Sequence, residues 1–205
     1  EEDIKVIVLR SSGEGAFCGG AFFNELLTLY TEEQGKTFFS GFANLINAMR
    51  KCPKMIIARV HGKCVGGGVG LVAAADYAIA TENAEVKLSE LTIGIGPFVV
   101  GPVIEKRIGM GAFIDASMWR PADWARKKGL FAELHPNTEN MDESVARLSS
   151  ELRNANPEAL LELKKFCWKG TDHWDSLLPE QAAISGKLVV SKFTKAALEK
   201  IKMKA

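Results

Sequence analysis

The chain has 205 residues, of which 47% are hydrophobic and 25% charged, and its formal net charge is +1. This length suffices for one good-sized domain of ordinary globular composition. A charge so close to zero argues against a nucleic-acid or membrane partner, and no apolar run is long enough to span a bilayer. The four cysteines are far apart and form no C-x-x-C pair, which predicts reduced thiols. With no secretory signal in the sequence, we expect a cytoplasmic protein.

The first two thirds of the chain alternate between strand and helix patterns. Residues 4–12 (IKVIVLRSS) are β-branched and apolar on both faces, which predicts a buried strand. After a Gly-rich loop, residues 38–52 carry apolar side chains at helical spacing. A second buried strand is predicted over 54–62, a small-residue helix over 68–78, and another strand over 76–81. This alternation predicts an α/β domain.

The C-terminal part carries helical patterns only. An apolar stripe over 144–152 predicts one helix. Asn156 and Pro157 are typical of the N-cap and the first position of the next helix. Residues 180–205 form a third helical segment.

Two glycine-rich loops follow predicted strands. The first is GAFCGGAFF (15–23), and the second has three consecutive glycines at 66–68 followed by Gly70, at the mouth of the small-residue helix. The second is neither a Walker A loop, because Lys63 precedes the glycines, nor a G-x-G-x-x-G fingerprint. The glycines could form a tight turn with close packing, or they could expose backbone N–H groups that bind an anion. Two such loops can aim two donors at one point, as an oxyanion hole requires.

The two loops, an A-x-x-x-L-x-E segment at 84–90 and a G-I-x-P loop at 94–97 occur in this order. Together they resemble the crotonase (enoyl-CoA hydratase/isomerase) superfamily over nearly the whole chain, and the loop resembles its methylglutaconyl-CoA hydratase-like branch. The resemblance implies an α/β fold, with a spiral of ββα units over 1–135 and a C-terminal helical trimerisation region over 136–205. It also implies a homotrimer or hexamer that acts on acyl-CoA thioesters, with coenzyme A only as part of the substrate and no metal.

The resemblance assigns the oxyanion-hole donors to the N–H groups of Ala21 and Gly67, and the acid/base role to Glu90. Apolar neighbours on both sides of Glu90 predict that its carboxylate is partly buried, whereas the plain alternative is a solvated charge at a strand end. The other residues expected around the substrate are Cys18, Gly20, Phe22, Gly66, Gly68, Gly70 and Pro97.

Two positions depart from the family pattern. Gly70 stands where family hydratases commonly carry a first glutamate, and Phe22 stands where the family often has aspartate. Glu90 alone must then serve as acid and base in turn, or other polar groups must hold the water. We expect a hydratase that adds water to a 2-enoyl-CoA, of branched or 3-methylglutaconyl type. An isomerase that shifts the double bond of a 3-enoyl-CoA and a non-catalytic acyl-CoA-binding subunit stay open as alternatives.

Overall fold

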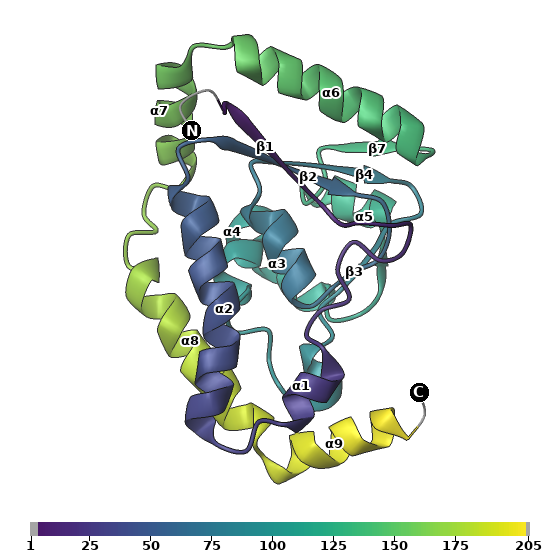
Figure 1. The fold of residues 1–205 in the computed structure, drawn as a ribbon, viewed down its shortest axis with the longest axis vertical. Coiled ribbons are helices and arrows are strands. Elements are labelled where there is room, and N and C mark those ends of the chain that lie inside the picture. The colour runs from purple at the N-terminus through teal and green to yellow at the C-terminus, as the bar shows by residue number, and fades with distance from the viewer. Residues whose placement is uncertain (1–3, 204–205) are drawn as a thin grey trace.

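The structure is a computed structural model that describes residues 4–203 (Figure 1). A four-stranded parallel sheet lies at its centre, in the order β1 (Val6–Arg10), β2 (Met55–Val60), β4 (Tyr77–Thr81) and β7 (Glu133–His135). A smaller sheet joins β3 (Cys64–Val65), β5 (Glu85–Lys87) and β6 (Arg120–Pro121), with β3 and β5 parallel. Strands and helices alternate up to β7, so the predicted α/β class is confirmed.

Strand β2 is buried at every residue, as predicted, because both faces of the central sheet are covered. Successive side chains of a strand point to opposite faces. Ile57 packs with α6 (Thr138–Asn154), which lies across one face of the sheet in Figure 1. Ile56 and Ala58 point the other way, into the main core. This two-sided burial explains why five of the six residues of β2 are apolar; the exception is Arg59, which pairs with Asp142.

The first strand is less buried than predicted. Strand β1 is at the edge of the sheet, and Ile7 and Val8 are 39% and 38% exposed. An edge strand has a neighbour on one flank only, so its apolar composition alone does not reveal its exposure. The prediction of a fully buried strand over residues 4–12 is therefore wrong.

Helices α2 (Glu32–Lys51) and α8 (Trp174–Val189) pack side by side along one edge of the molecule (Figure 1). Their backbones come close where Gly35 of α2 meets Gly186 of α8. A Cβ on Gly35 would lie 2.7 Å from the Gly186 Cα, and a Cβ on Gly186 would clash with the backbone N of Lys36. The absence of side chains at this crossing lets the two helices approach.

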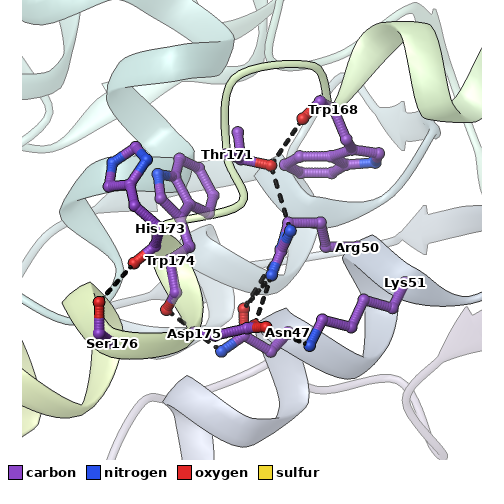
Figure 2. A network of polar contacts seen from close by, with 9 residues as sticks. All are labelled: Asn47, Arg50, Lys51, Trp168, Thr171, His173, Trp174, Asp175 and Ser176. Atoms are coloured by element: carbon purple, nitrogen blue, oxygen red, sulfur yellow. Dashed lines mark hydrogen bonds and ion pairs between the residues drawn. The ribbon is translucent and has the colours of Figure 1, made fainter.

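A polar network fixes the C-terminal end of α2 to the first turn of α8 and to the turn before it. Figure 2 shows Arg50 and Lys51 converging on Asp175, each at 2.6 Å. Arg50 Nη1 also donates to the Thr171 hydroxyl at 3.3 Å. The Arg50 side chain is buried, so its pairing to Asp175 satisfies a charge that would otherwise be costly.

The remaining helical elements are α1 (Phe23–Leu27), α3 (Gly67–Ala74), the 3₁₀ helix η1 (Glu90–Ile93), α4 (Gly101–Asp115), α5 (Ala122–Lys127), α7 (Pro157–Cys167) and α9 (Lys192–Lys202). The predicted cap of α7 is confirmed, because Asn156 Oδ1 accepts from Glu158 N at 2.9 Å and Pro157 is the first helical residue. Within residues 4–203, none of the helices is long and apolar enough to cross a membrane.

The third helical segment of the C-terminal part is two helices. Ser191 separates α8 from α9, and its hydroxyl accepts from Thr194 N at 3.2 Å. This N-cap starts a new helix where the sequence pattern was read as one segment. The division of the chain at residue 135 stays a prediction, and its outer bounds at residues 1 and 205 lie outside the described residues.

Candidate active site

Three segments that are distant in sequence are laid side by side by backbone hydrogen bonds. Cys18 N donates to Lys63 O at 3.2 Å, and Val65 N donates to Cys18 O at 2.9 Å, which fixes the first glycine loop against β3. Gly66 N donates to Lys87 O at 2.8 Å, which ties the end of β3 to β5. The first glycine loop, the start of α3 and η1 therefore open on the same cavity.

This cavity has a volume of about 60 Å³ and brings together Ala21, Gly67 and Glu90, the three residues predicted to be catalytic. Gly66, which was predicted to contact substrate, also lines it. Its apolar walls are the side chains of Phe23, Leu26, Phe39, Phe42, Ile93 and Ile95. The site thus combines a single carboxyl group and backbone amides with an apolar surround.

The two predicted donors are free to bind a ligand oxygen. Gly67 is the first residue of α3, so its N–H has no acceptor within the helix and lies at the positive end of the helix dipole. Ala21 follows Gly20, whose φ of +85° favours glycine. Within residues 4–203, neither N–H is hydrogen-bonded. A Cβ at Gly67 would clash with Phe42 Cε1, so the Phe42 ring would have to move to admit any other residue.

Glu90 is the first residue of η1, and its carboxyl group is buried. Burial raises its pKa from 4.5 to about 7. Its Oε2 has no hydrogen-bond partner among the described residues. Its Oε1 approaches Gly66 so closely that a Cβ on this glycine would lie 3.1 Å away. A carboxyl group with this pKa can accept and release a proton at neutral pH, as acid/base catalysis requires.

The neighbours of Glu90 behave differently from one another. Leu88 and Ile93 are buried, but Leu91 is 60% exposed. The tight 3₁₀ turn directs Leu91 to the surface while Glu90 faces inward. The predicted partial burial of Glu90 is confirmed.

Comparison with known proteins identifies the family. A family model described as enoyl-CoA hydratase/isomerase matches residues 1–203. The chain belongs to the crotonase superfamily. The crystal structure of enoyl-CoA hydratase from Bacillus halodurans superposes with a TM-score of 0.88 at 21% identity, covering 98% of this chain and 83% of that one. The predicted crotonase-like fold is thereby confirmed.

Among curated relatives, the human mitochondrial Delta(3,5)-Delta(2,4)-dienoyl-CoA isomerase is 28% identical over 180 residues, which are 83% of this chain and 50% of that protein. Mouse methylglutaconyl-CoA hydratase is 32% identical over 97 residues, 47% of this chain and 31% of that protein. This crotonase thus spans about half the length of the dienoyl-CoA isomerase it matches.

In this crotonase, Gly70 occupies the position of the first hydratase glutamate, and there is no space there for a side chain. A Cβ on Gly70 would lie 2.5 Å from Val100 Cγ1 and 2.7 Å from Val100 Cβ. Both residues are buried, so no longer side chain fits between α3 and α4 at this point. Among the residues that line the cavity, Glu90 is the single carboxylate.

Five further predicted substrate-binding residues do not line the cavity: Cys18, Gly20, Phe22, Gly68 and Pro97. Gly68 packs on Cys18, because a Cβ there would lie 2.6 Å from the Cys18 Cβ. Gly20 gives the loop its positive φ, and the Phe22 side chain is 63% exposed. Pro97 lines a different, apolar cavity together with Phe98. Binding roles for these residues, like that of Gly70, stay predictions.

Sequence reasoning missed most of the cavity wall, and Phe39, Phe42 and Ser89 are the instructive cases. Phe39 and Phe42 were read only as the apolar stripe of a core helix, yet both reach the cavity from α2. Ser89, next to Glu90, places a hydroxyl group there. Their helical spacing predicts a buried face correctly, but no local pattern says that this face borders a site.

Proposed function

We propose that this crotonase binds an unsaturated acyl-CoA thioester and shifts its double bond, with Glu90 as the single acid/base. One observation carries the proposal: a lone buried carboxyl group with a pKa of about 7 shares a cavity with two free backbone donors. A double-bond shift needs one group that takes a proton and returns it elsewhere. The similarity to a dienoyl-CoA isomerase supports the same class of reaction.

In the proposed reaction the thioester oxygen accepts hydrogen bonds from the N–H groups of Ala21 and Gly67. The Glu90 carboxylate removes a proton from C2 of a 3-enoyl-CoA, and the electron pair moves onto the thioester oxygen. Each donor stabilises this negative charge and contributes on the order of 10²–10³ in rate. The protonated Glu90 then returns its proton at C4, which leaves the 2-enoyl-CoA.

Hydration of a 2-enoyl-CoA, including 3-methylglutaconyl-CoA, is the second candidate, and Ser89 favours it. A Cβ on Gly66 would lie 3.5 Å from Ser89 Oγ and 3.1 Å from Glu90 Oε1, so both oxygens lie over the same glycine. A hydroxyl group can donate and accept, and with Glu90 it could orient one water molecule. The similarity to methylglutaconyl-CoA hydratase supports this alternative.

A mass-resolved turnover assay separates the candidates. We would incubate the protein with a 3-enoyl-CoA, crotonyl-CoA and 3-methylglutaconyl-CoA, and would compare Glu90→Gln with Glu85→Gln. Glu85 is a matched control, because it is an exposed glutamate on the preceding strand that pairs with Lys63 at 3.6 Å. Glu90→Gln should lower turnover on the order of 10²–10⁴-fold, since it removes the proton carrier.

Each outcome has a definite meaning. A shifted double bond without change of mass supports the isomerase, and the gain of one water supports the hydratase. Equal turnover by wild type and Glu90→Gln would contradict the role of Glu90. Binding of the thioesters without turnover would leave the non-catalytic acyl-CoA-binding subunit, for which the exposed Phe22 and the closed position at Gly70 are the motivating features.

A further inference from the structure

A second, larger cavity lies at the other end of helix α3. Its volume is about 370 Å³, and it is enclosed by the C-terminal end of α3, by α4 and by α7. The eight residues of α3 span roughly 11 Å, at 1.5 Å per residue, between Gly67 in the candidate active site and this cavity. The mechanism proposed above uses none of its residues.

The walls of this cavity are mostly apolar. They are formed by Met55, Ala73, Ala75, Val103, Leu163 and Trp168. Leu163 is partly exposed at the side of α7, so the cavity communicates with the surface. Its size falls within the range of small-molecule sites, which combine apolar walls with a few polar groups.

The polar groups of the cavity are mainly cationic. Lys164 is buried and satisfied, because it pairs with Asp76 at 2.9 Å and donates to Lys54 O at 2.7 Å. Lys106 and Arg107 also line the cavity, and no carboxylate within residues 4–203 pairs with either. Asp76 is the one carboxylate in the lining, so three cations and one anion give the cavity wall a net charge of +2.

Arg107 is the most informative of these residues. Its Nη2 donates to Asp76 O at 3.2 Å, but its Nε is buried and has no acceptor in the described part of the chain. Burial lowers the pKa of its guanidinium, and the nearby Asp76 carboxylate raises it. A guanidinium with a free N–H beside apolar walls suits a planar carboxylate, which it can bind through parallel hydrogen bonds.

We propose that this cavity is a binding site for an aliphatic carboxylate, whose charged group binds Arg107 and Lys106 and whose chain packs against Met55, Leu163 and Trp168. The excess of positive charge in the lining selects an anion, and the apolar walls select one with a hydrocarbon chain. A small inorganic anion would leave the walls unfilled, and a neutral chain would leave the Arg107 N–H unpaired.

Cysteine protection tests the site and locates the ligand at once. Cys167 lines this cavity and is the exposed thiol among the four, whereas Cys18 belongs to the first glycine loop. We would measure alkylation of each cysteine by N-ethylmaleimide, using peptide mass analysis, with octanoate as the probe. Octanol and inorganic phosphate are the matched controls for the charge and the chain. Octanoate should slow the alkylation of Cys167 several-fold, and neither control should match it.

Two variants at the exposed Leu163 sharpen the test without disturbing the core. Leu163→Glu places a negative charge at the cavity and should weaken octanoate protection about tenfold, since like charges repel. Leu163→Gln introduces a side chain of the same shape as glutamate but without charge, and it should weaken octanoate protection less than Leu163→Glu does. Absence of protection at Cys167, protection of Cys18 in its place, equal protection by octanol or phosphate, or equal effects of the two variants would each overturn the proposal.

Discussion

The surroundings of Glu90 disfavour the ionised form of its carboxyl group. Its buried Oε2 has no hydrogen-bond partner in residues 4–203, and burial raises its pKa to about 7. Buried carboxyl groups without partners destabilise a folded protein once they ionise. Groups with such shifted pKa values cluster at functional sites. Burial of Glu90 therefore both lowers the stability of the fold and gives the carboxyl group the pKa that its proposed role requires.

The cost of Glu90 can be measured as a pH dependence of stability. Its pKa is 4.5 when solvated and about 7 in the fold, so the folded state holds its proton longer. The free energy of unfolding should therefore fall as the pH rises from about 4.5 to 7, by at most about 3 kcal/mol. In urea denaturation, Glu90→Gln should match wild type near pH 4 and exceed it near pH 8. A Glu85→Gln control should not show this difference, and equal stabilities of wild type and Glu90→Gln near pH 8 would contradict the buried ionisation.

The contact of Gly70 with Val100 predicts a coupled pair of substitutions. Gly70→Ala should lower the free energy of unfolding by about 1–3 kcal/mol, because its Cβ would lie 2.5 Å from Val100 Cγ1. Val100→Ala should lower it as well, by opening a small cavity. The double variant should lose less free energy of unfolding than the sum of the two single losses, which a double-mutant cycle in urea would measure. Additive effects would show that Gly70 and Val100 do not constrain one another.

At the level of single residues, the sequence predicted those site residues that belong to its motifs. The resemblance placed Ala21, Gly67 and Glu90, and the structure puts all three around one cavity. It did not predict the wall at Phe42 or the closure by Val100, because both depend on contacts between segments far apart in the chain. Local sequence patterns predict which residues are buried, but they do not predict which buried surfaces contact one another.

At the level of elements, the C-terminal helix α9 supports the segments that carry the site. Lys195 Nζ donates to three backbone oxygens at the end of α1, those of Leu26 at 3.1 Å, Leu27 at 3.2 Å and Leu29 at 2.5 Å. Phe193 of α9 also packs on Gly94, which ends η1. The helix thereby contacts both the loop side and the Glu90 side of the cavity.

The crossing of α2 and α8 predicts opposite effects for two glycine substitutions. Gly186→Ala should lower the free energy of unfolding by about 1–3 kcal/mol, because the new Cβ would meet the backbone of α2. Gly41→Ala is the matched control within α2, where a Cβ meets nothing within 4 Å. It should raise stability by about 0.5–1 kcal/mol through helix propensity. Thermal or urea denaturation measures both, and a neutral Gly186→Ala would contradict the close crossing.

Elements were predictable where periodicity and capping residues are strong. The burial of β2 and the Asn156 cap of α7 were predicted correctly. The exposure of β1 was not, because a strand at an edge and one in the middle can share the same composition. Ser191 was missed as a cap because the apolar pattern continues across it.

At the level of the whole molecule, three large apolar side chains are exposed near the end of α4. Ile114 and Met118, at and just beyond the end of α4, are 62% and 63% exposed, and Met110, one turn before Ile114, is exposed as well. The spacing by four places Met110 and Ile114 on the same side of the helix. Exposed apolar clusters often mark protein contacts, and the resemblance to crotonases predicts a trimer or hexamer.

Light scattering after gel filtration tests this assembly and its surface. Wild type should have three or six times the mass of one chain, and Ile114→Glu should shift it toward the monomer, because association would bury an unpaired charge. Ile114→Leu keeps the apolar surface and should leave the mass unchanged. Monomeric wild type would contradict the predicted oligomer itself. An intact assembly in Ile114→Glu would instead place the contact on another face, so the two measurements separate the existence of the assembly from its location.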